Sequence, residues 1–343
     1  MPQKLFLALL LTGCTGGALD SGGGSYADAE SQSTGFIFKG PMSAGSTITV
    51  QPLDGSLSPS GDAVEVSVED DSGAFTAALP FQGPVLVTAV GATFDEAYGE
   101  VVEAPLTLSA YAYIDGDEVD LNVNLITDLA VPLVERIVAD GEPVADAISR
   151  AETEVLNVIP LGGAAPDLSA GDAANLTPYS DSYESGWLFA FSAVTARAGR
   201  DLEEHGTGDL PSLMSGIKES LAETGEVDQT SLDVLYTAEE LTNPDLAVLT
   251  LTKQLSALSG ELTIADMHLA LDSDHDRVLN IDDNCRYAPN PDQESSGAGP
   301  FGAACDLRLS DISASETVGC GVVAATGDLR CWACLLYTSD AAD

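Results

Sequence analysis

The chain of 343 residues is 45 % hydrophobic, which is enough for two or three domains with packed cores. It has 12 Lys and Arg against 55 Asp and Glu, a formal net charge of −43. A surface this acidic repels phosphate backbones and anionic headgroups, so it argues against nucleic acid or peripheral membrane binding and suits divalent cations. For most of these carboxylates, an acidic surface that serves solubility alone is an equal alternative.

The first residues follow the pattern of an export signal. Residues 1–13 place a lysine before a short apolar run, LFLALLL, and the sequence LTGC then ends at Cys14. This resembles the signal peptide and lipobox of bacterial lipoproteins, in which the peptidase cuts before a cysteine whose thiol is lipidated. The resemblance implies a lipid anchor at Cys14 in the cell envelope, with Thr15 favouring the outer membrane or cell surface. Residues 14–34, rich in Gly and Ser, would form a flexible tether. An ordinary buried thiol at Cys14 is the alternative.

Residues 35–123 predict an all-β sandwich, because short runs of alternating apolar and polar residues are separated by turn residues. The predicted strands are 36–38, 47–50, 64–68, 74–79, 85–90, 106–114 and 119–123. Within them, DSGAF at 71–75, LP at 79–80 and GPVLV at 83–87 resemble the carboxypeptidase-regulatory-like, transthyretin-like sandwich. That resemblance implies a structural or adhesive module without chemistry of its own.

Residues 124–270 change to a helical period and predict an all-α domain of about six helices. In the first helix we expect Thr127 as the cap, Pro132 near the first turn and Gly141 at the end. Its apolar face would be Leu129, Leu133, Val134, Ile137 and Val138. A second helix over 144–158 would bury Val144, Ile148, Ala151 and Val155. Further helices are predicted over 186–204, 210–223, 231–240 and 243–259.

The stretch DSDHDRVLNIDD, residues 272–283, holds five carboxylates whose repulsion calls for a cation. Oxygen-bearing side chains recur along it at the spacing of a calcium loop, and a cation the size of Ca²⁺ takes about six to eight oxygen ligands. The predicted ligands are Asp272, Asp274, Asp276, the backbone carbonyl of Val278, Asn280 and Asp283. An acidic, solvated linker without metal is the alternative. Zinc is disfavoured because His275 is the only imidazole nearby.

The residues after this loop extend the pattern. DNC ends at Cys285, NPDQ occupies 290–293 and CD begins at Cys305. Together with the loop they resemble a thrombospondin type 3 repeat over residues 271–308. The resemblance implies that an ion and a disulfide, rather than a hydrophobic core, supply the order. It also implies that Cys285 is linked either to Cys305 or to a neighbouring repeat.

The segment departs from that repeat at two places. Arg277 stands where the repeat has Gly for a sharp turn, which predicts local strain and some repulsion of the ion. The second acidic run of the repeat is reduced to Glu294. We therefore expect one calcium ion in the first half and none, or a weakly bound one, in the second.

Residues 309–333 form a second repeat-like unit. ISA at 312–314, Cys320, Gly327 and the pair Cys331-Trp332 resemble one repeat of a chromosome-condensation-regulator type β-propeller. The resemblance implies an incomplete propeller repeat with a hairpin around Gly327. A disulfide between Cys320 and Cys331 could bridge the two strands of that hairpin. A lone disulfide hairpin is the alternative.

The final residues, CLLYTSDAAD at 334–343, resemble a translated sequencing adapter, a common scar in metagenomic assemblies. We therefore expect the natural protein to continue beyond about Ala333. Setting aside Cys14 and Cys334 leaves Cys285, Cys305, Cys320 and Cys331, which an exported protein would oxidise in pairs.

The sequence nominates no catalytic or cofactor-binding side chain. His205, His268 and His275 stand apart, and the S-x-x-K tetrad at 215–218 lacks the companion motifs of penicillin-recognising enzymes, so we interpret it as a helix surface. No glycine-rich phosphate loop with a following lysine is present.

These features predict a multidomain, non-enzymatic envelope protein, in which a β-sandwich, a helical domain and a calcium-stiffened stalk present a binding propeller. The expected partners are calcium, the membrane through the lipid anchor alone, and an extracellular protein or glycan, but not nucleic acid. Two alternatives stay open. The chain could be the N-terminal anchor and stalk of a secreted hydrolase whose catalytic domain is missing, or a periplasmic scaffold.

Overall fold

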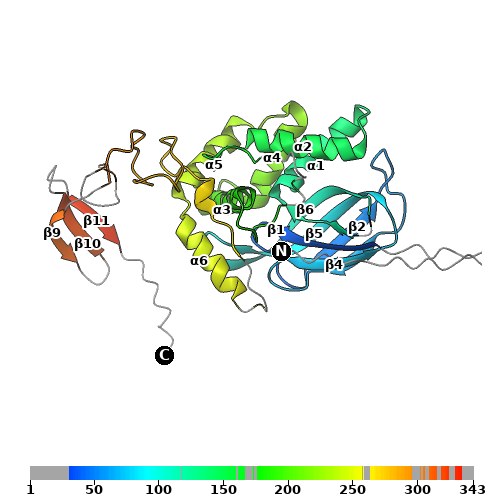
Figure 1. Cartoon of the computed structure of the whole chain (residues 1–343), viewed down its shortest axis with the longest axis horizontal. Helices are drawn as coiled ribbons and strands as arrows, with labels where there is room; N and C mark the ends of the chain where they lie inside the picture. The colour runs from blue at the N-terminus through cyan, green and yellow to red at the C-terminus, as the bar shows by residue number, and fades with distance from the viewer. Residues whose placement is uncertain are drawn as a thin grey trace, which may run out of the picture.

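The computed structural model describes most of the chain from Ser31 to Ala333. The described residues are 31–116, 118–159, 161–166, 173, 176–256, 258, 263–295, 302, 304–305, 309–314, 318–323 and 329–333. The predictions for the signal peptide, for Cys14 and for residues 334–343 lie outside these ranges. Figure 1 shows two β-sheets in the N-terminal half, helices in the middle of the chain and a small sheet near its C-terminal end.

Two four-stranded sheets contain every strand predicted before residue 124. In the first, β1 (Ser31–Phe38) pairs antiparallel with β4 (Ala74–Leu79) and parallel with β7 (Glu118–Asp120) and β8 (Val123–Asn124). In the second, the order is β3-β2-β5-β6. Its strands are β2 (Thr47–Pro52), β3 (Val64–Ser67), β5 (Gly83–Asp95) and β6 (Glu100–Ile114). The strand prediction is confirmed, with the last predicted run divided into β7 and β8.

The first strand begins earlier than predicted. Residues 31–34, expected as the end of the tether, belong to β1, where Ser31 pairs with Leu79. Their polar sequence carries no strand signal, so pairing with two neighbouring strands decides their conformation. Gly35 is required at the centre of β1, because a Cβ there would lie 2.6 Å from the carbonyl oxygen of Leu121.

Six helices follow in the described part of the chain and gather on one side of the sheets (Figure 1). They are α1 (Leu125–Ala139), α2 (Val144–Val158), α3 (Tyr183–Glu204), α4 (Leu210–Thr224), α5 (Gln229–Leu241) and α6 (Pro244–Leu255). Helix α3 is buried on most of its circumference, as expected of a central helix. The predicted apolar stripe of α2 is buried. No helix in these ranges is long and apolar enough to cross a membrane.

The start of α1 differs from the prediction. Asn124, not Thr127, is the N-cap, and its side chain accepts hydrogen bonds from the amides of Ile126 and Thr127. The hydroxyl of Thr127 instead accepts a hydrogen bond from the backbone amide of Asn124, which completes a capping box. Because the helix begins directly after β8, Pro132 lies inside α1 rather than in its first turn. Gly141 follows the helix in a left-handed conformation with φ of 98°.

The sheets and helices share one hydrophobic cluster, and buried polar contacts join them. The amide of Gly40 donates to the hydroxyl of Ser192 on α3 at 2.9 Å. The amide of Ser109 on β6 donates to Oδ1 of Asp128 on α1 at 2.8 Å. Burying these backbone groups without partners would be costly, so each contact fixes the helices on the sheets.

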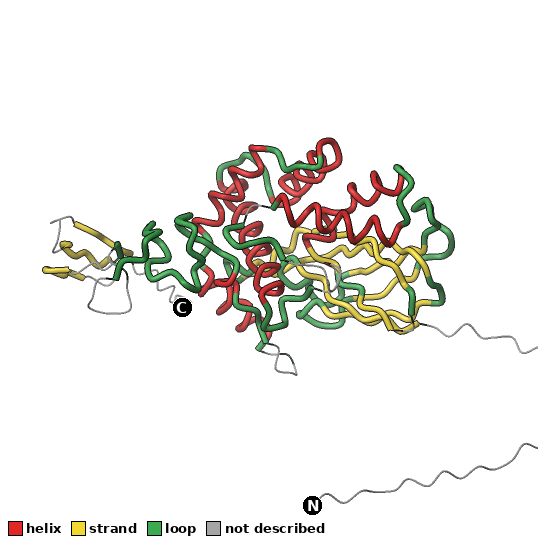
Figure 2. The backbone as a smooth tube through the Cα atoms, turned by 45° about the horizontal axis from the view of Figure 1, so that its top comes forward, coloured by secondary structure: helices red, strands yellow, loops and turns green. Residues whose placement is uncertain are grey.

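The C-terminal strands β9 (Leu309–Ala314), β10 (Val318–Val323) and β11 (Leu329–Ala333) form an antiparallel sheet in the order β11-β10-β9. This sheet stands apart from the main body (Figure 2). Val322 pairs with Leu329, which confirms the predicted hairpin. Cys320 and Cys331 are opposite each other in the register, and their side chains lie outside the described residues.

Candidate metal centre

The acidic loop is the segment of residues 272–283, and it begins where the chain leaves the helical core. The preceding residues Met267, Ala270 and Leu271 are fully buried. The amide of Asn280 donates to the carbonyl of Leu271 at 2.8 Å, so the loop returns to its own starting point. In Figure 1 this segment lies between the helices and β9–β11. The fold therefore holds both ends of the loop.

Three of the predicted ligands come together. Asp272, Asp274 and Asp276 each offer one carboxylate oxygen, and these oxygens lie within 4.8 Å of one another. Backbone amides orient two of the carboxylates, since the amide of Arg277 donates to Oδ2 of Asp272 at 2.8 Å and that of Val278 to Oδ1 of Asp276 at 2.9 Å. Such a group of converging carboxylates can hold a metal ion.

Two oxygens of the loop have no partner in the described structure. Oδ2 of Asp274 and Oδ2 of Asp283 are buried and form no hydrogen bond. Asp283 is only 9 % exposed. Burial, followed by the neighbouring negative charges of Asp276 and Asp283, raises the pKa of Asp274 to about 6. A buried carboxylate oxygen without a donor costs free energy that a bound cation would remove, so these residues fit a hard cation.

The other predicted ligands have different positions. The side chain of Asn280 is fully buried and engages Ser273, whose amide donates to Asn280 Oδ1 at 3.1 Å and whose hydroxyl accepts from Nδ2 at 2.9 Å. In this structure Asn280 therefore closes the loop internally, a role that its position in a ligand pattern did not indicate. The backbone amide of Val278 donates to Oδ1 of Asp276. The predicted ligand is the backbone carbonyl oxygen of the same residue.

The backbone at Arg277 has the conformation predicted for the glycine position. Its φ is 77°, in the left-handed region, and that of His275 is 57°. Both residues carry a Cβ that disfavours this region, which concentrates strain next to the carboxylates.

The second half of the segment supports the first. Gln293 donates through Nε2 to Oδ1 of Asp283 at 2.9 Å and accepts from the amide of Asn284 at 2.9 Å. The amide of Asn290 donates to Oδ2 of Asp276 at 2.7 Å. Sequence reasoning assigned no role to Asn290 and Gln293, although both belong to the NPDQ motif. Their function is to orient two of the carboxylates from outside.

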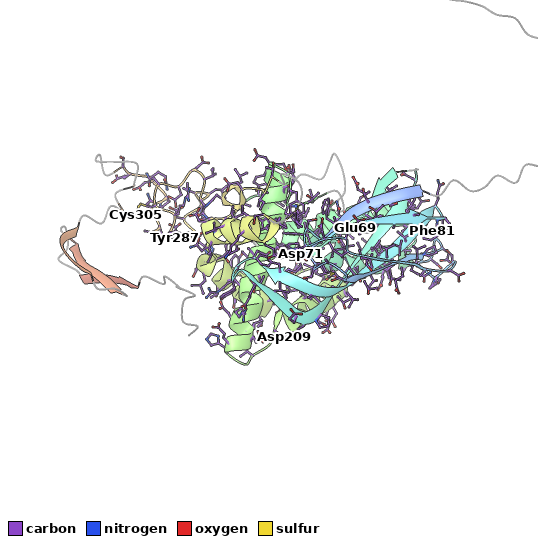
Figure 3. All side chains as sticks on the ribbon, turned by 90° about the horizontal axis from the view of Figure 1, so that it is seen from below. Glu69, Asp71, Phe81, Asp209, Tyr287 and Cys305 are labelled. Carbon is purple, nitrogen blue, oxygen red and sulfur yellow. A yellow bond between two sulfur atoms is a disulfide. The ribbon has the colours of Figure 1, made fainter. Side chains whose placement is uncertain are left out.

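Cys285 and Cys305 form a disulfide with a Cα–Cα distance of 5.4 Å, so the chain pairs them with each other. The amide of Cys285 also donates to Oδ1 of Asp283 at 2.7 Å. The bridge thus closes the NPDQ turn against the last carboxylate of the loop. Cys305 and Tyr287 lie at the end of the main body that faces β9–β11, opposite Phe81 (Figure 3).

His205, His268 and the S-x-x-K tetrad lie in separate parts of the fold. His205 is exposed at the end of α3, and the buried His268 places Nε2 3.1 Å from Oδ1 of Asp245. In the S-x-x-K tetrad Ser215 is exposed, whereas Nζ of Lys218 lies 2.7 Å from Oδ1 of the buried Asp128. This lysine therefore joins α4 to α1.

Comparison with known proteins adds little. No protein family model matches the chain, and no curated protein matches it. A crystal structure from Pseudomonas aeruginosa, described as that of a "putative carbohydrate binding protein", aligns at 10 % sequence identity over 28 % of this chain and 89 % of the other. Its TM-score is 0.19, and a likeness at that level carries no argument about function.

Proposed function

We propose that residues 272–283 bind one Ca²⁺ ion and that the ion orders the segment connecting the helices to β9–β11. The observation that carries the proposal is a pair of buried carboxylate oxygens without hydrogen-bond partners. One belongs to Asp274, which is among the three converging carboxylates, and the other belongs to Asp283. A divalent cation would neutralise these charges, which otherwise repel one another at short range.

The donor chemistry favours calcium over other metals. The converging ligand atoms are carboxylate oxygens, and hard oxygen donors suit Ca²⁺ and Mg²⁺ rather than zinc. An irregular loop with strained turns provides flexible coordination, which Ca²⁺ accepts, whereas Mg²⁺ demands near-octahedral geometry. The Asn280 side chain would have to share its oxygen between Ser273 and the ion, or leave its ligand position to water.

The proposed biological role is structural. The described residues of the segment over 271–305 have a disulfide and many side-chain to backbone hydrogen bonds, but few of them are buried and apolar. An ion would therefore supply much of its stability. We propose that it acts as a stiff connector between the helical body and the C-terminal repeat, in a protein anchored to the envelope through lipid at Cys14. The C-terminal repeat would contact an extracellular protein or glycan.

Calorimetric titration of the whole chain in physiological salt tests the calcium proposal. We expect saturable binding of about one Ca²⁺ and much weaker binding of Mg²⁺. The same heat in both titrations, or no saturable calcium heat after pretreatment with chelator, would refute it. Surface proteolysis of intact cells tests the location, since an exposed stalk is cleaved and a periplasmic scaffold is protected.

A further inference from the structure

Glu239 lies near the C-terminal end of α5 and has no exposed surface. Its Oε1 accepts two backbone hydrogen bonds, from the amide of Gly162 at 3.0 Å and from the amide of Asp272 at 3.3 Å. Its Oε2 has no hydrogen-bond partner in the described structure and lies 3.6 Å from Nε2 of His275. One buried carboxylate of the helical body thus holds the first residue of the acidic loop.

The turn at Gly162 is pressed directly against the same loop residue. A Cβ at Gly162 would lie 2.4 Å from Cβ of Asp272 and 2.7 Å from its backbone nitrogen. The next residue, Gly163, donates its amide to the carbonyl of Ala270 at 2.8 Å. No side chain fits between the turn and the loop, so a displacement of one must displace the other.

Helix α5 makes a second contact with the loop through His275. The imidazole of His275 packs edge-on against the ring of Tyr236, with centroids 5.8 Å apart, and Nδ1 lies 3.6 Å from Oε1 of Glu240. The helix therefore holds the loop both at its first carboxylate residue and between its second and third.

We propose that Glu239 is a positioning residue, which fixes the backbone of Asp272 so that its carboxylate faces the ion and couples ion binding to the stability of α5 and the turn at Gly162. This inference rests on the calcium proposal. Outer residues that orient a ligand typically change metal affinity by about 10- to 100-fold when removed. The coupling is reciprocal, because an ion that prefers the docked loop also stabilises the helix that docks it.

Two independent pairs of variants of the whole chain test the coupling. Glu239→Ala removes the acceptor of both amides, and Asp233→Ala removes an exposed carboxylate of the same helix that accepts a hydrogen bond from Gln229. Gly162→Ala forces the turn and the loop apart without changing any charge, whereas Gly216→Ala adds a methyl group where nothing lies within 4 Å. Glu239→Gln keeps an oxygen acceptor and serves as the conservative variant.

The measurements are calcium titration and thermal unfolding in calcium and in chelator. We expect Glu239→Ala and Gly162→Ala to bind Ca²⁺ about 10-fold more weakly and to lose most of the calcium-dependent rise in Tm. Glu239→Gln should recover most of the affinity, and both controls should stay within about twofold of the parent.

Each result decides the matter. Parental affinity and an unchanged calcium-dependent rise in Tm in both Glu239→Ala and Gly162→Ala would overturn the coupling and leave the calcium site standing. A parent chain that binds no calcium would remove the site and the coupling together. If Glu239→Ala does not fold, Gly162→Ala and Glu239→Gln still give the comparison, since neither removes the acceptor oxygen.

Discussion

The backbone amide of Arg277 donates to Oδ2 of Asp272 at 2.8 Å, which closes the first turn of the acidic loop. The bond requires the chain to reverse at Arg277, where φ is 77°. A residue with a Cβ is strained in this region by about 1 kcal/mol relative to glycine. The turn thus orients a proposed ligand at the expense of local strain.

Arg277→Gly should therefore increase calcium affinity by about fivefold, the equivalent of 1 kcal/mol, if ion binding fixes this turn. Arg277→Ala is the matched variant, because it removes the same positive charge and keeps the Cβ. Calorimetric titration separates the two effects. Equal affinities for the two variants would assign any gain to charge alone and contradict the role of strain.

Replacing the carboxylates that carry the unpartnered oxygens should abolish tight binding. We expect Asp274→Asn and Asp283→Asn each to weaken calcium binding by at least about 10-fold, since each removes a charge from the coordination sphere. Asp282→Asn is the control, because Asp282 is exposed and adjacent to Asp283. A comparable loss in Asp282→Asn would show that only net charge matters, and the defined ligand set would then be wrong.

The raised pKa of Asp274, about 6 against an ordinary value of 3.8, predicts a pH dependence with a definite sign. The folded state binds a proton at Asp274 more tightly than the unfolded state does. The protonated carboxyl therefore contributes most to the stability of the fold below pH 4, and this contribution is lost as pH rises to about 6. Calcium affinity has the opposite trend and should rise through pH 6, because the ion needs the ionised carboxylate.

Chemical unfolding in chelator between pH 4 and 7, together with calcium titrations over the same range, measures both trends. Asp274→Asn is the reference, since it lacks the titrating group but keeps the neighbouring carboxylates. Curves of the parent and the variant that run parallel over this range would contradict the assignment to Asp274.

The S-x-x-K tetrad at 215–218 allows a test of whether Lys218 has a structural role. Lys218→Met leaves the buried Asp128 without its cation and should destabilise the fold by roughly 2–4 kcal/mol. Ser215→Ala, at the exposed first position of the tetrad, should change stability by less than about 0.5 kcal/mol. Denaturant unfolding measures both, and equal effects of the two substitutions would contradict a purely structural role for Lys218.

Local patterns predicted the elements well, because each depends on residues close in the sequence. Period-two alternation identified the strands over residues 36–123, and the apolar stripe of α2 is buried as its spacing required. The prediction placed the cap of α1 at Thr127 instead of Asn124, three residues earlier, since both residue types suit a cap and the end of β8 decides where the helix begins. Residues 31–34 were missed because their partners are strands distant in sequence.

The sequence by itself determined where an ion could bind, because alternating oxygens in a short loop are a local property, as is the left-handed turn at Arg277. The tertiary structure decided what holds that loop. Glu239 is one of 55 acidic residues and has no distinguishing neighbours, so its role exists only where α5, the turn at Gly162 and Asp272 meet. Contacts between segments far apart in sequence depend on how the core packs, and no short pattern encodes them.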